Sequence, residues 1–164
     1  MSITYEDVRD FLYSEARALD DKEWDRWLEH YAKEAEYWMP SWDDDGQLIT
    51  DPQREVSLMY YARRDGLEDR VFRIKTERSS ASSLPEPRTH HMLSNIELLK
   101  VDESSCEVRY NWFNSSYRYK TVDSYFGTTF VNIKRDEQGA LKITRKKIIL
   151  KNDFIHHVVD VYHV

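Results

Sequence analysis

The chain has 164 residues, a length that suits one domain spanning residues 1–164. Its 24 basic and 30 acidic side chains give a net charge of −6, and the scattered basic residues argue against nucleic-acid binding. No apolar stretch approaches the ~18 residues that a membrane span needs, and the N-terminus shows no signal pattern. The single cysteine, Cys106, cannot form an internal disulfide, so a reducing cytoplasm is the expected location.

Two amphipathic helices are predicted at the start of the chain. Thr4 and Asp7 have the spacing of a capping box, and a helix should follow as far as about Leu19. Apolar residues recur at helical spacing along it, with Glu15 as a polar residue on the same stripe. Asp20 should end this helix and cap a second one, whose apolar stripe anchors it in the core. That stripe consists of Trp24, Trp27, Leu28 and Tyr31.

Two short strands with an acidic loop between them come next. Residues 37–40 predict a strand stopped by Pro40, and residues 56–62 form a β-rich run. The loop, residues 41–51, contains three consecutive aspartates. A calcium-binding EF-hand loop needs oxygen ligands at alternating positions and a glutamate at position 12, and residues 43–46 lack that spacing. The loop is therefore predicted to be a solvated turn.

A third helix is predicted from Asp65, because Asp65 and Glu68 have capping-box spacing. Residues 79–87, with four serines and two prolines, should form a surface loop after it. The apolar stripe of the helix consists of Leu67, Val71 and Ile74, and its basic residues are Arg70, Arg73, Lys75 and Arg78. The simple interpretation of the basic residues is a solvated face, and the alternative is a surface that binds an anionic partner.

The rest of the chain is predicted to be β structure. Alternating apolar and polar residues, and turn residues between the runs, give five strands. They span residues 92–100, 106–112, 117–135, 141–150 and 154–164, with turns at 114–116 and 136–139 and a bulge at Gly127. Helices followed by antiparallel strands make an α+β fold. Helices packed on one face of a strongly curved sheet give a cone with an open mouth.

Several segments resemble the small (beta) subunits of aromatic ring-hydroxylating dioxygenases. They are residues 69–76, 87–90 and 93–96, on the third predicted helix, the end of the loop and the following strand. Residues 38–44 and 151–153 are similar to the benzoate and anthranilate 1,2-dioxygenase members of that family. The resemblance covers nearly the whole chain.

The resemblance implies both a fold and a partner. The fold is the cystatin-like or NTF2-like α+β cone. The partner is a catalytic alpha subunit that carries a Rieske [2Fe-2S] cluster and a mononuclear Fe(II), supported by beta subunits in an α3β3 hetero-hexamer. The assembled enzyme adds both atoms of dioxygen to an aromatic acid, benzoate or anthranilate, with electrons from NADH through a separate reductase. This chain is then a non-catalytic support with no cofactor of its own.

The residues themselves predict no catalytic or metal-binding set. A Rieske centre takes two cysteines and two histidines, whereas Cys106 stands alone and is expected to be a buried structural thiol. A mononuclear iron site takes two histidines and a carboxylate, but the adjacent pairs at 90–91 and 156–157 would point to opposite faces of a strand. An acid–base site in the mouth of the cone could use Asp123, His91, Tyr31 and Tyr125, although each could equally be a structural group. A free-standing hydratase or isomerase, or a ligand-binding module, therefore stays open as an alternative.

Subunit contacts are expected at the basic helix and its loop. The apolar stripe of the helix is committed to the core, so its arginines must point elsewhere, and arginine is enriched at protein interfaces. The expected contact residues are Arg70, Arg73, Arg78 and Arg88, although Arg70 and Arg73 could instead bond to the strand that follows. If these arginines are not the contact, the aromatic strands near Trp112 and Tyr119 are the next candidates.

Overall fold

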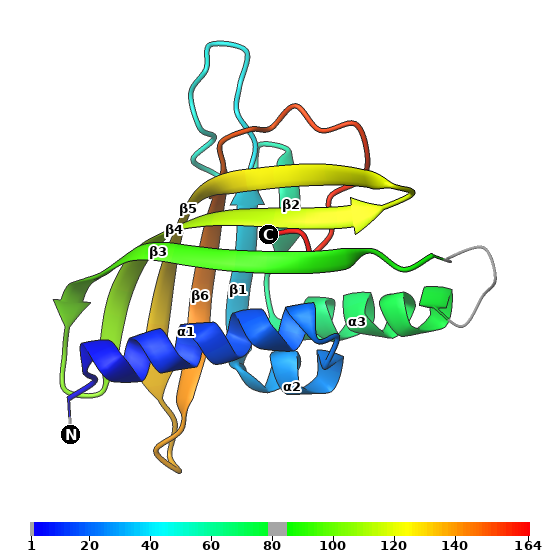
Figure 1. Cartoon of the computed structure of the whole chain (residues 1–164). Helices are drawn as coiled ribbons and strands as arrows, with labels where there is room; N and C mark the ends of the chain where they lie inside the picture. Colours follow the sequence, from blue (N-terminus) through cyan, green and yellow to red (C-terminus); the bar gives the residue numbers. More distant parts are fainter. Residues whose placement is uncertain (1, 79–84) are drawn as a thin grey trace.

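A curved sheet carries three helices along one side in the computed structural model, which describes residues 2–78 and 85–164 (Figure 1). Within those ranges the helices are α1 (Tyr5–Asp20), α2 (Trp24–Glu29) and α3 (Arg64–Arg78), and the strands are β1 (Tyr31–Pro40), β2 (Ser57–Tyr61), β3 (Arg88–Val101), β4 (Ser105–Arg118), β5 (Thr121–Arg135) and β6 (Leu141–Leu150). The sheet order is β2-β1-β6-β5-β4-β3. Strands β1 and β6 pair in parallel, and the other neighbouring strands pair antiparallel. This is the α+β arrangement that the sequence predicts, with two short strands before α3, but the parallel pairing of β1 with β6 was not predicted.

The N-terminal helices form largely as predicted. The Thr4 hydroxyl accepts a hydrogen bond from the Asp7 amide, and the Asp7 carboxylate accepts one from the Thr4 amide, so the capping box is confirmed. Trp24 and Trp27 are buried, also as predicted. The second helix is not capped by Asp20, however, because Glu23 precedes its first turn and makes no side-chain cap.

One strand start and one helix start in the first half of the chain differ from prediction. Strand β1 begins at Tyr31 rather than at residue 37, so Tyr31 belongs to the sheet and not to the helical stripe. The first half of β1 was not predicted because the residues after Tyr31 are mostly polar. The pairing of this part with β6 is irregular between Tyr31 and Glu36. Helix α3 begins at Arg64, one residue before the predicted start, and its stripe of Leu67, Val71 and Ile74 is buried as expected.

The predicted turn at residues 114–116 is wrong. Strand β4 runs through these residues to Arg118, and the chain turns at Tyr119 and Lys120, which have φ values of 54° and 59°. Asn114 and Ser116 are buried inside the cone, and Asn114 Nδ2 donates a hydrogen bond to the His163 carbonyl. Polar residues typical of a turn are therefore interior groups that bind the end of the chain.

The predicted last strand, residues 154–164, is also wrong. This segment has turns and bends but no strand, and it folds across the sheet so that Val161 and Val164 are buried. Its apolar residues reflect packing against the cone interior rather than pairing in the sheet. No helix in residues 2–78 or 85–164 is long and apolar enough to cross a membrane.

Gly127 marks a close approach of two strands rather than the predicted bulge. Strand β4 pairs with β5 in unbroken register through Trp112 and Gly127. A Cβ atom at Gly127 would lie 1.8 Å from the Ile149 carbonyl oxygen on β6. The irregularity of β5 lies further along, between Asn132 and Ile133.

Candidate functional site

The mouth of the cone holds a pocket of about 550 Å³. It lies between α3, the β4–β5 hairpin and the C-terminal segment, and its lining includes Arg70, Arg118, Asp123, His157, Tyr162 and His163. A pocket of this size lies within the range that holds small-molecule ligands. It is the place where an acid–base site was expected.

Tyr125 and His157 form a hydrogen-bonded pair beside this pocket. The Tyr125 hydroxyl lies 2.5 Å from His157 Nε2, and His157 Nδ1 lies 2.9 Å from the Val158 carbonyl oxygen. Because the carbonyl can only accept, Nδ1 carries the proton, and Tyr125 donates to Nε2. Asp123 Oδ2 lies 3.8 Å from the same Nε2. Burial, and then the nearby Asp123 carboxylate, raise the pKa of Tyr125 well above its usual value, so the phenol stays protonated.

The four acid–base candidates do not form one site. Asp123 and Tyr125 come together, joined by His157, which the sequence did not select. His91 instead lies with Nδ1 2.5 Å from Asp20 Oδ1, and Tyr31 donates its hydroxyl to Glu15 at 2.7 Å in the core. The signal that could have identified His157 was weak, because it depends on the C-terminal segment folding back over β5.

The residues of this chain do not fit the iron centres that the resemblance implies. Cys106 is buried, and burial raises its pKa to about 11, which disfavours the thiolate that binds metal. His90 is exposed while the His91 side chain is 4% exposed, so these neighbours face opposite ways as predicted. The strand argument does not apply to His156 and His157, which lie in the irregular C-terminal segment. In the described ranges, no three His, Cys, Asp or Glu side chains gather where they could hold a metal ion.

The predicted contact arginines have different surroundings. Arg70 forms a two-point ion pair with Asp160 of the C-terminal segment, and the Nε–Oδ1 distance is 2.9 Å. Arg70 is therefore bonded within the chain. Its partner is the C-terminal segment and not the strand after Asn95, which was the alternative expected from the sequence. Arg73 is exposed on α3, and Arg78 ends α3 with a side chain that lies outside the described part of the structure. Arg88 is exposed at the start of β3, with its guanidinium 5.7 Å from the centre of the Tyr117 ring.

The aromatic candidates also separate. Trp112 is 5% exposed and belongs to the core, so its side chain is not on a surface that a partner could contact. Tyr119 is 65% exposed at the tip of the β4–β5 hairpin, under the Arg118 guanidinium. Neighbouring side chains in a strand face opposite sides, so Phe113, next to Trp112 on β4, points outward and is 43% exposed.

An exposed aromatic patch covers the outer face of the sheet, on the side of β4 opposite to the Trp112 side chain. Phe113 and Phe126 stack with ring centres 6.4 Å apart and are 43% and 42% exposed. Met92 pairs opposite Phe113 on β3 and is 45% exposed. Tyr117 and Val122 pair further along the same two strands, β4 and β5. We call Met92, Phe113, Phe126, Tyr117 and Val122 the outer aromatic patch. Side chains of this size exposed side by side are typical of a surface that another protein covers.

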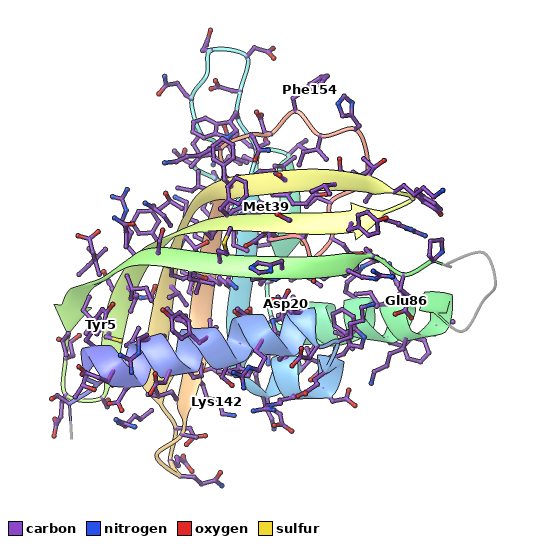
Figure 2. The ribbon with its side chains drawn as sticks, viewed as in Figure 1. Tyr5, Asp20, Met39, Glu86, Lys142 and Phe154 are labelled. Atoms are coloured by element: carbon purple, nitrogen blue, oxygen red, sulfur yellow. The ribbon has the colours of Figure 1, made fainter. Side chains whose placement is uncertain are left out.

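The C-terminal segment adds further exposed apolar residues. Phe154 and Val158 are each 86% exposed, and Figure 2 shows Phe154 standing out from the loop that follows β6. The other end of this segment is buried through Val161 and Val164. One short segment therefore anchors itself inside the cone and presents apolar side chains to its surroundings.

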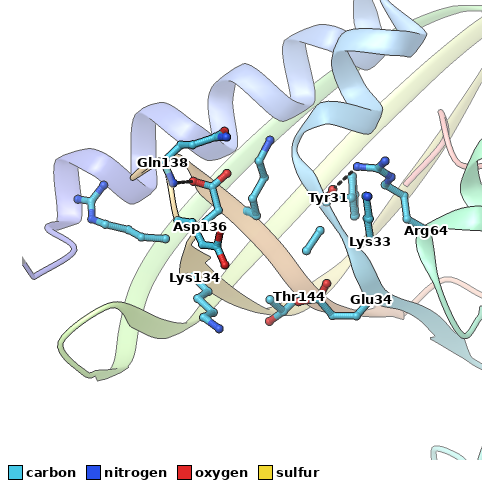
Figure 3. A pocket seen from close by; sticks show the side chains of 12 residues that line it. Tyr31, Lys33, Glu34, Arg64, Lys134, Asp136, Gln138 and Thr144 are labelled. Carbon is cyan, nitrogen blue, oxygen red and sulfur yellow. Dashed lines mark hydrogen bonds between the residues drawn. The ribbon is translucent and has the colours of Figure 1, made fainter.

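A larger groove of about 670 Å³ lies where β1 and β6 diverge (Figure 3). Its lining carries both charges, from Lys33, Arg64, Lys134, Arg135 and Lys142 and from Glu34, Asp136 and Glu137. Arg64 Nη1 donates to the Tyr31 carbonyl at 2.9 Å and so joins α3 to β1 at the edge of this groove. Its mixed charge and open shape select no small ligand.

The fold is that of NTF2-like proteins. A solved NTF2-like protein with a cystatin-like fold from Novosphingobium aromaticivorans superimposes with a TM-score of 0.62 at 12% identity, covering 90% of this chain and 82% of that one. At such low identity the likeness shows the fold alone. The predicted cone is therefore confirmed.

Sequence comparison identifies the family. The family model for the ring hydroxylating beta subunit matches residues 14–157. The chain is 58% identical to the toluate 1,2-dioxygenase subunit beta of Pseudomonas putida, over 100% of both chains. It is 54% identical to the benzoate 1,2-dioxygenase subunit beta of Acinetobacter baylyi, over 99% of this chain and 95% of that protein. Identity to the anthranilate 1,2-dioxygenase small subunit of the same organism is 35%, over 96% and 95%.

A solved structure supports the same assignment. The beta subunit of the benzoate 1,2-dioxygenase of Burkholderia mallei superimposes with a TM-score of 0.86 at 48% identity, covering 100% of this chain and 99% of that one. The chain belongs to the beta subunits of aromatic ring-hydroxylating dioxygenases, of the benzoate and toluate 1,2-dioxygenase type. It is thus part of an oxidoreductase of aromatic acid degradation, and a beta subunit implies an alpha subunit as its partner.

Proposed function

We propose that this chain is the non-catalytic support of a catalytic alpha subunit in an α3β3 terminal oxygenase. The alpha subunit carries the Rieske [2Fe-2S] cluster and the mononuclear Fe(II), and a separate reductase delivers electrons from NADH. The assembled enzyme adds both atoms of dioxygen to the ring of an aromatic acid. The role of this chain is to hold alpha subunits together.

The observation that carries this division of labour is the single cysteine. A Rieske cluster needs two cysteine and two histidine ligands, and Cys106 stands alone in the sequence. Burial also keeps that thiol protonated. A ring-hydroxylating oxygenase that contains this chain must therefore hold its cluster in another subunit.

We assign the contact with other subunits to the exposed residues around the cone. Arg73, Arg78 and Arg88 supply polar contacts from α3 and the start of β3, and Tyr119 contributes from the hairpin tip. The outer aromatic patch and the exposed Phe154 and Val158 supply apolar area. Aromatic side chains and arginines together are the composition that protein interfaces favour. Arg70 serves the fold through Asp160, and Trp112 serves the core.

Co-expression with the alpha subunit tests the proposed assembly. The two chains should co-purify at equal stoichiometry with a mass that fits α3β3 by size-exclusion chromatography with light scattering. The complex should contain iron and turn over an aromatic acid when supplied with reductase and NADH. The isolated chain should be colourless, iron-free by elemental analysis and inactive. Stoichiometric iron in the isolated chain, or turnover by it alone, would overturn the proposal.

Alanine substitution tests the interface residues one at a time. Truncating a paired arginine at a subunit contact should weaken assembly by about 2–5 kcal/mol. The variants Arg73→Ala, Arg78→Ala and Arg88→Ala should therefore dissociate at higher protein concentration than the wild-type complex, with unchanged melting of the chain. Arg54→Ala, at an exposed arginine between β1 and β2, is the matched control. If all three variants assemble as the control does, the contact lies on the outer aromatic patch instead.

We propose benzoate or a methyl-substituted benzoate as the substrate. The support is the higher identity to the benzoate and toluate subunits than to the anthranilate subunit. Assays of the reconstituted complex on benzoate, toluates, anthranilate, toluene and naphthalene should show the benzoates as preferred substrates. Turnover confined to the neutral hydrocarbons would contradict this assignment.

A second candidate function is a small-molecule acid–base site in the mouth of the cone. The pair of Tyr125 and His157 beside Asp123 favours it, because His157 and Asp123 line one pocket and the buried Tyr125 hydroxyl is hydrogen-bonded to His157. Hydratase or isomerase activity of the purified chain, lost in Asp123→Asn, would establish this function. If Asp123→Asn and Tyr125→Phe leave the activity of the assembled oxygenase unchanged and the chain alone is inactive, the pair is structural.

A further inference from the structure

Three buried polar atoms inside the cone have no hydrogen-bond partner within the described part of the chain. They are His91 Nε2, Trp112 Nε1 and Asn114 Oδ1. The His91 side chain is 4% exposed, and Trp112 and Asn114 are 5% and 2% exposed. Buried polar atoms are nearly always bonded to protein or to an ordered water, so three such atoms require an explanation.

The three atoms belong to side chains on one face of two neighbouring strands. His91 of β3 lies directly opposite Asn114 of β4, and Leu93 lies opposite Trp112 two residues away. Residues two apart in a strand point to the same side, so His91, Trp112 and Asn114 share the interior face. All three line one small cavity of about 10 Å³.

The cavity offers one donor, one acceptor and one imidazole nitrogen. The indole N–H of Trp112 can only donate. Asn114 uses its amide nitrogen to donate to the His163 carbonyl at 3.1 Å, which leaves Oδ1, an acceptor, facing the cavity. His91 Nδ1 lies 2.5 Å from an Asp20 carboxylate oxygen and therefore carries a proton, which leaves Nε2 as the imidazole nitrogen available at the cavity.

We propose that this cavity binds a single water molecule. The water accepts a hydrogen bond from Trp112 Nε1, donates one to Asn114 Oδ1 and makes a third with His91 Nε2. The cavity has about the least volume that holds one water, and buried waters typically make about three hydrogen bonds. A metal cation is disfavoured by the indole N–H, and a larger ligand by the volume. Glu15 and Lys146, which also line the cavity, are already bonded to each other.

The water completes a hydrogen-bonded chain through the protein. Asp20 at the end of α1 binds His91, the water joins His91 to Asn114, and Asn114 holds the His163 carbonyl. His163 Nδ1 in turn accepts from the Asp160 amide, and Asp160 pairs with Arg70 of α3. The site therefore couples the helices to the C-terminal segment, which presents Phe154 and Val158 to the surroundings.

A crystal structure of the full chain at a resolution that orders internal waters is the direct test. A density peak should lie within hydrogen-bond distance of all three atoms. In solution, the Trp112 indole proton should show a cross-peak to a long-lived water in rotating-frame NMR spectra. An empty cavity in the crystal together with no water cross-peak would overturn the proposal.

Two matched variants separate the water site from the neighbouring carboxylate. His91→Phe removes the imidazole nitrogen and projects a C–H into the cavity, so both the density peak and the cross-peak should be lost. Thr89→Val removes another hydrogen bond to Asp20, of 3.0 Å, but leaves the cavity lining intact, so both signals should remain. Equal loss in both variants, or an unchanged peak in folded His91→Phe, would contradict the assignment of His91 as a ligand of the water.

Discussion

Glu15 of α1 and Lys146 of β6 form an ion pair inside the protein, with Oε1 and Nζ 2.8 Å apart and side chains 3% and 4% exposed. Trp27 and Tyr31 donate to the same carboxylate oxygen at 2.9 and 2.7 Å. Burial alone would raise the pKa of Glu15, but Lys146 and these hydrogen bonds outweigh it and lower the pKa to about 2. The pair therefore stays ionised and ties the first helix to β6, a central strand of the sheet.

Stability should fall in acid because of Glu15. Its pKa is depressed in the folded chain from a usual value of 4.5, so its contribution is complete above about pH 4.5 and is lost as the pH falls toward 2. The complete loss corresponds to about 3 kcal/mol, of which about 2 kcal/mol should be lost between pH 7 and pH 3. Urea unfolding at pH 7 and pH 3 measures the difference. Glu15→Gln should lose this part of the pH dependence, and an equal acid slope in that variant would contradict the prediction.

Removing one member of the ion pair should cost more than removing both. Lys146→Met leaves the buried Glu15 carboxylate without its partner and should lower the free energy of unfolding by about 3–5 kcal/mol. The double variant Glu15→Gln with Lys146→Met leaves no buried charge and should recover a large part of that loss. Thermal and urea unfolding of the single and double variants form the double-mutant cycle. A double variant as unstable as the sum of the singles would show that the two residues are not coupled.

Breaking the Arg70–Asp160 pair should loosen the C-terminal segment. The Asp160 side chain is 6% exposed, and without Arg70 it would be a buried carboxylate with an uncompensated charge. Arg70→Ala should lower stability by about 2–4 kcal/mol and increase amide hydrogen exchange in residues 155–164. The exposed Arg73→Ala on the same helix should change stability by less than about 0.5 kcal/mol. Equal melting of the two variants would assign Arg70 no role in the fold.

A methyl group at Gly127 should push β5 and β6 apart. The added Cβ would meet the Ile149 carbonyl oxygen at 1.8 Å, and backbone cannot move aside as a flexible side chain can. Gly127→Ala should therefore destabilise the chain by about 3 kcal/mol or more. Gly139→Ala has open space around it, and its φ of +83° should cost only about 1 kcal/mol. Melting temperatures of the two variants make the comparison, and a mild Gly127→Ala would show that the strands can separate.

Cys106 should react slowly with thiol reagents. Its side chain is buried, and a pKa of about 11 instead of 9.0 lowers the thiolate fraction at pH 8 by about a hundredfold. A disulfide-exchange reagent should modify the folded chain at least that much more slowly than the urea-unfolded chain. Comparable rates in the two states would mean that β4 opens readily around Cys106.

The sequence was sufficient for features that depend on local spacing. The capping box of Thr4 and Asp7, the buried stripe of α3 and the alternation along β4 each follow from helix or strand periodicity over a few residues. The family could also be identified, because its motifs are contiguous runs. Glu15 was visible as a polar residue on an apolar stripe, but its partner was not.

Only the tertiary structure decided which distant groups meet. Lys146 lies 131 positions from Glu15, and Asp160 lies 90 from Arg70, so no periodicity links them. The fold-back of the C-terminal segment explains the main errors. The segment predicted as a last strand instead packs against the cone interior and lines the pocket at its mouth. This fold-back brings His157 to Tyr125, and it makes Asn114 an interior group instead of a turn residue. Burial and partner choice belong to the assembled cone, because the free energy of a buried polar group depends on neighbours that the chain supplies only after it folds.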